Sequence, residues 1–355
     1  MWRSGQRRAG GRPISDRYST GQVEDQAVQC ARRSVRRVRV SVARPEQTSN
    51  ALGRAAVQIG PRALSLAAEA KHFLGVAYGK IAHFFQQTFG LQVNRSTLAR
   101  ADQRVAQAHH AIYEQIQQVV QASPAAHVDA TGWKVAGRLA WLWTAATRQA
   151  TLYLIHRRRG HEVVENILGP AYPGKLICDS FLAYEALDYP QQKCLQHLIR
   201  RGLELEAIKL GRAKKFGQAV ALLLRQAIHL RHRFQAGEHS VHGYAIACGW
   251  VEAACHRLLI GRLVDEDNVR LLNLLHRQRH RLFAFLYDEN LEPTNALAEQ
   301  ALRPAVAIRK LSACNRSWRG AFVHTILMSV LRTCRQQGQD FLIWAIQRLR
   351  SLDES

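Results

Sequence analysis

The sequence predicts a mixed α+β fold in which helices come first, strands follow and further helices complete the chain. Three observations predict this order. Apolar residues recur at helical spacing over residues 60–120, aromatic and β-branched runs of strand length occupy residues 124–200, and helical spacing returns after residue 200. Hydrophobic residues make up 47% of the 355, which is enough for a buried core. We therefore divide the chain into five segments: 1–48, 49–123, 124–200, 201–290 and 291–355.

Residues 1–48 are rich in Gly, Arg and Ser, contain no Lys and show little periodicity. A segment of this composition cannot bury enough apolar surface to offset the entropy lost on ordering. We expect a disordered basic arm.

Segment 49–123 contains a helix-turn-helix pattern. A first helix from residue 78 would end at Gly90, and Asn94 or Ser96 would cap a second helix that carries Arg95 and Arg100. This arrangement is typical of DNA-binding segments, so both arginines are candidate DNA contacts. From spacing alone, an ordinary helical hairpin is the favoured alternative. The apolar face of the first helix would consist of four residues: Ile81, Phe84, Phe85 and Phe89.

Segment 124–200 should form the sheet. Its tryptophans could stack on nucleic-acid bases, but we favour core packing for Trp133, Trp141 and Trp143. Residues 192–197 could be a strand or could lead straight into a helix. The expected strands and intervening helix, in order, are 126–130, 139–146, 150–155, helix 160–168 and strand 174–179.

The two C-terminal segments are expected to be helical. In segment 201–290 we predict a strong helix over 271–286, and in segment 291–355 a helix capped by Thr294 or Asn295. A long amphipathic helix should span 318–337. Its buried stripe would consist of Phe322, Val323, Ile326, Leu327, Val330, Leu331 and Cys334.

The strongly basic charge predicts a nucleic-acid partner. The 50 Lys and Arg against 27 Asp and Glu give a net charge of +23, concentrated in residues 1–45, 200–236 and 303–350. Separate basic blocks suit an extended phosphate backbone better than a small anion. An Arg-favouring genome is the alternative explanation. Seven scattered Cys indicate a reducing cytosol, and no apolar run is long enough for a membrane span, so we expect a cytoplasmic, nucleoid-associated protein with no membrane contact.

Three acidic residues are candidates for catalysis. Asp129 and Asp179 each follow apolar residues in an expected strand, and Glu299 lies among apolar neighbours on an expected helix. An acid in such a place is costly unless it is paired or binds a metal. Converging carboxylates can hold two Mg²⁺ ions for phosphodiester chemistry. For each acid alone, a capped, paired or exposed carboxylate remains the favoured alternative.

From Tyr78 onward the chain resembles bacterial transposases of the insertion-sequence-66 type, which have a DDE catalytic domain on an RNase H-like fold. The similarity is carried by several stretches in the same order as in that family, and it covers about three quarters of the chain. The stretches are His127–Trp133, Leu139–Trp143, Arg159–Glu162, Cys178–Tyr184, Cys194–Leu198, Pro293–Pro304, Arg309–Lys310, Gly320 and Arg332–Gly338.

The resemblance implies a mechanism and a set of residues. Asp129, Asp179 and Glu299 would hold two Mg²⁺ ions, which Mn²⁺ can replace, to nick the ends of an insertion sequence and transfer the freed 3′-hydroxyl to target DNA. Segment 201–290 becomes a helical insertion in the RNase H-like core, and segment 291–355 completes that core. Three basic residues would clamp DNA phosphates: Arg303, Arg309 and Lys310.

The resemblance also implies partners. These are double-stranded DNA, as terminal inverted repeats and target, further copies of the chain assembled on that DNA, and small accessory proteins of the element. The chain departs from the family pattern at Ala130, where Glu is common, and at Thr294 and Gln300, which flank Asn295 and Glu299. A catalytically inactive DNA-binding relative and another RNase H-like nuclease therefore stay as alternatives.

A further pattern, Cys194-x-x-His197, is half of a zinc-site spacing. Cys178 could be a third ligand, but the second half of the site is missing from the sequence. We favour structural packing for these residues over zinc binding.

Overall fold

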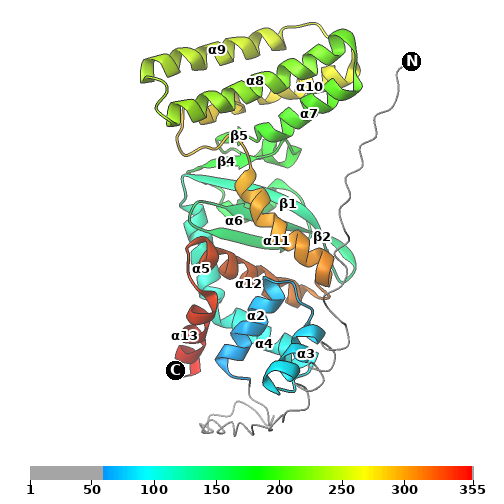
Figure 1. Ribbon diagram of the computed structural model, residues 1–355, viewed down its shortest axis with the longest axis vertical. Helices are drawn as coiled ribbons and strands as arrows, with labels where there is room; N and C mark the ends of the chain where they lie inside the picture. The colour runs from blue at the N-terminus through cyan, green and yellow to red at the C-terminus, as the bar shows by residue number, and fades with distance from the viewer. Residues whose placement is uncertain (1–58, 354–355) are drawn as a thin grey trace, which may run out of the picture. The chain divides into compact units, whose positions relative to one another are not determined.

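The computed structural model describes residues 59–353, so the expectation for residues 1–48, and for residues 49–58 of the next segment, lies outside the described residues. The fold is mixed α/β, as the sequence predicts, with a mixed sheet of five strands surrounded by helices (Figure 1). The strands are β1 (Ala125–Val135), β2 (Arg138–Ala146), β3 (Thr151–His156), β4 (Lys175–Cys178) and β5 (Gln191–Lys193).

The sheet order is β3–β2–β1–β4–β5. β1 to β3 form an antiparallel meander, whereas β4 and β5 run parallel to β1. The expected strands are confirmed with small shifts, and β1 runs on to Val135, past the expected end at residue 130. Residues 192–197 belong to two elements, because β5 ends at Lys193 and a helix begins at Leu195.

Side chains of β1 alternate between two cores, as the period of a strand requires. Ala126 and Val128 face a core that includes α6 (His161–Leu168) and α5 (His110–Gln121). Trp133 and Val135 face the other side, where α11 (Ala296–Ser312) and α12 (Trp318–Gln336) pack. Trp133 and Trp143 are buried, which confirms core packing for both; Trp141 is partly buried.

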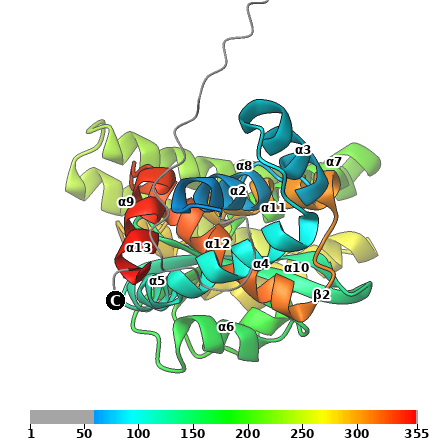
Figure 2. The same cartoon turned by 90° about the horizontal axis from the view of Figure 1, so that it is seen from below.

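The N-terminal helices are α2 (Pro61–His72), α3 (Tyr78–Phe89), α4 (Arg95–Ala108) and α5, and α13 spans Phe341–Asp353. Of the N-terminal helices, α2 and α4 pack beside α12 and α13, α3 packs on α2 and α4, and α5 packs on α12 and on β3 (Figure 2). A buried polar cluster joins three of the N-terminal helices to α12. Asp102 Oδ2 accepts hydrogen bonds from His72 Nε2 at 2.9 Å and Tyr78 Oη at 2.6 Å, while His72 Nδ1 lies 2.7 Å from His324 Nδ1.

The helix–turn–helix expected around Gly90 is present. Gly90 ends α3 with φ +66°, a conformation that glycine adopts without strain, and Asn94 precedes α4. Asn94 makes no side-chain capping bond. The expected apolar face of α3 is only half correct, because Phe84 and Phe89 are exposed.

The helices after β5 build a separate hydrophobic core. They are α7 (Leu195–Ile208), α8 (Gly211–Gln235), α9 (Val241–Leu259) and α10 (Glu266–Gln278), followed by the short 3₁₀ turns η2 (Arg279–Arg281) and η3 (Ala284–Leu286). Another 3₁₀ turn, η1 (Leu182–Ala186), lies between β4 and β5. The helix predicted over 271–286 is therefore wrong at both ends. It begins earlier, where the Asp265 side chain accepts from Asn268 N, and it ends at Gln278.

The amphipathic helix predicted over 318–337 is confirmed as α12, with one error. Phe322 is 51% exposed, whereas the rest of the predicted stripe is buried. Polar side chains of α12 hydrogen-bond to the sheet, which the hydrophobic pattern of the sequence does not predict. Ser329 Oγ accepts from the backbone N–H of Tyr153, and Thr333 Oγ1 accepts from that of Thr151, so the helix hydrogen-bonds the outer edge of β3. In the described part of the chain, no helix is long and apolar enough to cross a membrane.

We predict that Asp102→Leu lowers the free energy of unfolding by about 2–4 kcal/mol, because it leaves His72 and Tyr78 without their buried acceptor. Urea denaturation followed by circular dichroism measures this. The exposed Asp188→Leu is the matched control and should change stability by less than about 0.5 kcal/mol. Equal effects of the two substitutions would contradict a stabilising role for the cluster.

Candidate active site

Strand register brings the first two candidate acids together. The parallel pairing of β1 with β4 matches Ala125 with Lys175 and His127 with Ile177. Continued by two residues, this register sets Asp129 opposite Asp179. Residues in register on parallel neighbours point to the same face of a sheet. Both acids therefore point to the face that α11 covers, away from the core beneath Val128.

The third acid reaches this place on the first turn of α11. Asn295, which is fully buried, precedes that helix and donates from Nδ2 to the Val128 carbonyl at 2.9 Å. Its backbone N–H points to Cys194 Sγ at 3.1 Å. One side chain thus attaches the start of α11 to β1, immediately beside Asp129. Glu299 follows four residues later, on the turn whose first hydrogen bond joins Glu299 N to the Asn295 carbonyl.

The three carboxylates act on one another electrostatically. Burial raises the pKa of Asp129 to about 6, the Ala130 N–H opposes this, and the charges of Asp179 and Glu299 add to the rise. The neighbouring Cys194 side chain, together with Glu299 and Asp179, raises the pKa of His197 to about 9. The site therefore concentrates negative charge and holds a histidine cation beside it.

Asp129 and Glu299 line a cavity of about 370 Å³ together with Arg303. The cavity wall is completed by Ala130, Thr131, Leu302 and Val306. Three carboxylates at one end of a sheet supply the oxygen donors that Mg²⁺ prefers, and a divalent cation would relieve their mutual repulsion. The donor chemistry therefore fits such a cation.

The carboxylate oxygens are not all drawn tightly together. Asp129 Oδ1 accepts from Ala130 N at 2.7 Å, and Asp179 Oδ1 accepts from Phe181 N at 2.9 Å. Among residues 59–353, the set of potential metal ligands whose donor atoms all lie within 4.8 Å of one another is a different one: Cys194, His197 and Glu299. Glu299 belongs to both groups.

The basic residues predicted to contact DNA lie in different settings. Arg95 and Arg100 are exposed on α4, and Lys310 is exposed on α11. Arg303 is exposed at the cavity. Arg309 is already engaged by the protein, since Nη1 donates to Thr131 Oγ1 at 3.3 Å and to the Gly132 carbonyl.

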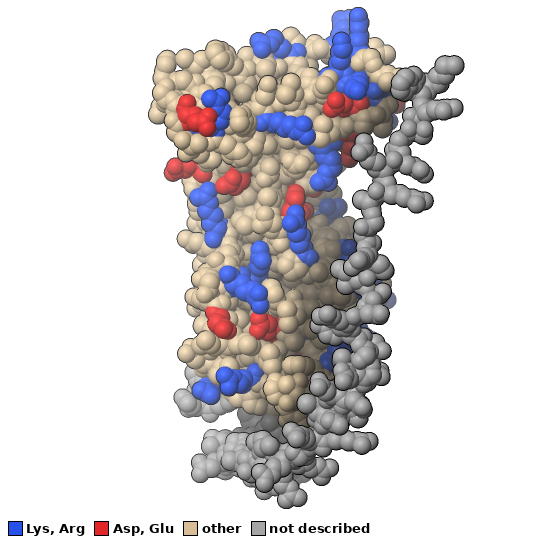
Figure 3. Space-filling model, in the orientation of Figure 1, with Lys and Arg blue, Asp and Glu red and all other residues tan. Residues whose placement is uncertain are grey.

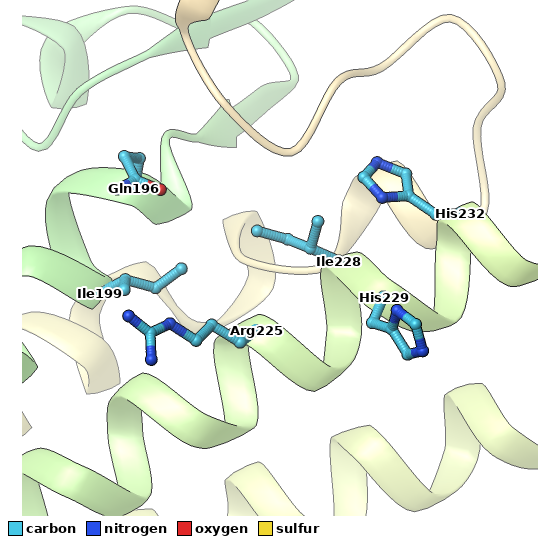
Figure 4. Close-up of a pocket in the computed structure, with 6 residues that line it drawn as sticks. All are labelled: Gln196, Ile199, Arg225, Ile228, His229 and His232. Atoms are coloured by element: carbon cyan, nitrogen blue, oxygen red, sulfur yellow. The ribbon is translucent and has the colours of Figure 1, made fainter.

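A second cavity of about 320 Å³ lies between α7 and α8 (Figure 4). Arg225, His229 and His232 project from α8 opposite Gln196 and Ile199 of α7, and no acid lines it. On the face drawn in Figure 3, Lys and Arg side chains are spread from the upper helices to the lower ones, with Asp and Glu between them. Positive charge on that face is distributed rather than gathered in one patch.

Two cations near the acids were given no role by sequence reasoning. Lys193 is fully buried, and its Nζ donates to the Asp179 carbonyl at 3.2 Å. The Arg159 guanidinium lies over the rings of Trp141 and Phe181, with its Cζ 4.6 and 4.1 Å from their centroids. Lys193 follows polar residues and had no local signal that could have singled it out. Arg159 begins one of the stretches that carry the resemblance, but that stretch gave it no role.

The raised pKa of Asp129 leads to a prediction for the free energy of unfolding of the metal-free protein, measured in the presence of chelator. Because its folded pKa, about 6, exceeds the unfolded value near 3.8, the native state holds the proton more tightly, and stability falls as pH rises between these values. Asp129→Asn should therefore raise the free energy of unfolding by about 1–2 kcal/mol at pH 7.5 and by little at pH 4. Urea denaturation at both pH values measures this, with exposed Asp188→Asn as control. A gain of the same size at pH 4 would refute the electrostatic cause.

Comparison with known proteins adds one match. The family model described as Transposase IS66 family matches residues 56–322, which is well over half of the chain. No curated protein matches the chain.

Proposed function

The chain belongs to the transposase IS66 family, and we propose that it is a DDE transposase that cuts and joins DNA strands at the ends of an insertion sequence. One observation supports this most. Asp129, Asp179 and Glu299, from segments separated by 50 and 120 residues, meet at one end of the sheet in a chain with a net charge of +23. A carboxylate cluster inside a strongly basic protein suits a metal-dependent reaction on a polyanion.

In this proposal Asp129, Asp179 and Glu299 hold two Mg²⁺ ions, or Mn²⁺ in their place. When bound, such ions activate the attacking water or 3′-hydroxyl and stabilise charge on the leaving oxygen. The protein's own part is positioning. The β1–β4 register sets the two aspartates side by side, Asn295 fixes the start of α11, and Lys193 hydrogen-bonds the Asp179 carbonyl.

Double-stranded DNA is the proposed partner, as terminal inverted repeats and as target. Arg303 stands at the cavity and is suited to a phosphate of the strand being cut. Lys310 and the arginines of α4 would contact DNA further away. The sheet, with α11 on one face, α6 on the other and α12 along the outer edge of β3, would be the RNase H-like core, and α7–α10 the helical insertion. Assembly of several copies on DNA, help from accessory proteins and association with the nucleoid belong to the same proposal.

We predict that Asp129→Asn, Asp179→Asn and Glu299→Gln each reduce strand cleavage by at least about 10³-fold, since each removes a metal-binding charge. DNA binding should persist. The assay uses DNA carrying the ends that flank the gene, with Mg²⁺ or Mn²⁺ and with chelator.

Glu292→Gln is the matched control, because Glu292 is exposed, paired with Arg148 and only seven residues before Glu299. It should leave cleavage unchanged. A variant that cuts at the wild-type rate would remove that acid from the site. If the wild-type chain binds these ends but never cuts, the non-catalytic DNA-binding alternative takes its place. Cutting without joining would favour another RNase H-like nuclease.

Replacement of Arg303 by Ala should affect DNA binding, whereas replacement of Arg309 by Ala should affect stability. Arg303→Ala should weaken DNA binding and reduce the slope of log affinity against log salt by about 1, as expected for one lost phosphate contact. Arg309→Ala should lower the free energy of unfolding by about 1–2 kcal/mol, because it removes hydrogen bonds to β1. Fluorescence anisotropy at several salt concentrations and urea denaturation separate the two effects. An unchanged salt slope for Arg303→Ala would exclude a phosphate contact.

A further inference from the structure

A second set of metal-ligating side chains lies against the proposed catalytic carboxylates. Cys194 is the residue before α7, His197 is in the first turn of that helix, and Glu299 is in the first turn of α11. Their donor atoms all lie within 4.8 Å of one another, and His197 Nδ1 is 3.9 Å from Glu299 Oε1. Glu299 is thus the third donor that the sequence pattern Cys194-x-x-His197 lacks.

Backbone contacts hold these donors in place. Leu195 N donates to the Pro293 carbonyl at 2.9 Å, and Asn295 N points to Cys194 Sγ at 3.1 Å. Cys194 N in turn donates to the Cys178 carbonyl at the end of β4. The starts of α7 and α11 are therefore fixed to each other and to the sheet. The ligand set thus stands on two anchored helix starts, which limits the rearrangement needed to bind an ion.

The donor types are those of a borderline-soft cation. One sulfur, one imidazole nitrogen and one carboxylate oxygen suit Zn²⁺, whereas Mg²⁺ requires oxygen. In a tetrahedral zinc site neighbouring donor atoms lie about 3.3–3.8 Å apart. The His197–Glu299 separation of 3.9 Å is just above this range, and since all donor atoms lie within 4.8 Å of one another, no pair has to close by more than about 1 Å. The side chains of His197 and Glu299 are 38% and 33% exposed, which gives an ion a path of entry.

We propose that Cys194, His197 and Glu299 form a Zn²⁺ site with an open fourth position, and that this site shares Glu299 with the oxygen-only set of Asp129 and Asp179. Zn²⁺ bound here takes up the Glu299 carboxylate and withdraws it from the carboxylate set. Zinc binding itself, which would displace the protons of the Cys194 thiol and the His197 imidazolium, depends only on the three ligands and not on the proposed function. Its second consequence, inhibition of Mg²⁺-dependent cleavage by Zn²⁺, rests on the proposed function.

The site is tested without DNA, on the full chain freed of metal with chelator. Co²⁺ is the optical probe, because a thiolate–Co²⁺ bond gives a strong near-ultraviolet band, and Zn²⁺ is then titrated in to displace it. We expect one equivalent of Co²⁺ with this band in the wild-type chain. Cys194→Ser should abolish the band, and His197→Gln and Glu299→Gln should each weaken Zn²⁺ binding by at least about tenfold.

Cys314→Ser is the matched control, since Cys314 is a partly buried cysteine outside the set. It should keep the band. A wild-type chain without the band, a Cys194→Ser chain that retains it, or its loss in Cys314→Ser would each overturn the site. Circular dichroism of each variant confirms that a lost band does not come from unfolding, and His197→Gln gives an independent result if Cys194→Ser is unstable.

The coupling between Zn²⁺ binding and Mg²⁺-dependent cleavage is measured in a separate experiment. At fixed Mg²⁺, micromolar Zn²⁺ should inhibit cleavage by the wild-type chain at least about tenfold more strongly than cleavage by Cys194→Ser. Equal inhibition would overturn the coupling and leave the zinc site standing. Absence of any cleavage would count against the proposed function, while the Co²⁺ measurement still decides the site.

Discussion

The parallel pairing of β1 with β4 is the constraint on which the rest of the site depends. Side chains alternate along a strand, so a slip of one residue would turn Asp129 into the core and Val128 out of it. The slip is opposed from both faces, because Ala126 and Val128 are buried in one core and Trp133 and Val135 in the other. The same apolar pattern that makes the strand therefore also orients the acid. No polar contact of Asp129 is needed for this.

The second constraint is the return of the chain after the long helical excursion. Closing a loop of about 100 residues is entropically unfavourable, but α7–α10 fold on their own core and shorten the effective loop. Gln192 then fixes its end. The fully buried amide of this β5 residue donates to the Leu282 carbonyl and accepts from Phe285 N, both at 2.9 Å. From there the chain reaches Pro293 and Asn295, which attach α11 to α7 and β1.

Sequence reasoning succeeded where the signal is local. The end of α3 at Gly90 follows from the positive φ that a glycine supplies, and the strands follow from short apolar runs of high β propensity. It failed where a residue that is distant in the sequence determines the burial or the local structure. Nothing near Phe322 shows that the side chain is half exposed, and helical spacing beyond Gln278 hides the two 3₁₀ turns that bring Leu282 and Phe285 to Gln192. The three acids could be predicted as site residues from their apolar neighbours and from the resemblance. The distances between them in the folded protein could not be predicted.

The same limit explains why sequence reasoning favoured structural packing over zinc binding for His197. Its helix supplies only Cys194 within reach, and the decisive neighbour, Glu299, lies about 100 residues away. Once the two helix starts are joined, Glu299 faces two chemically different surroundings. On one side are the oxygens of Asp129 and Asp179, and on the other are a sulfur and a nitrogen. A carboxylate is a ligand for both hard and borderline cations, so which cation it holds is set by its neighbours rather than by itself. Under the two metal-site proposals, the metal held by Glu299 would therefore depend on how α7 and α11 begin, and a change at Cys194 or His197 would alter metal choice without touching either aspartate.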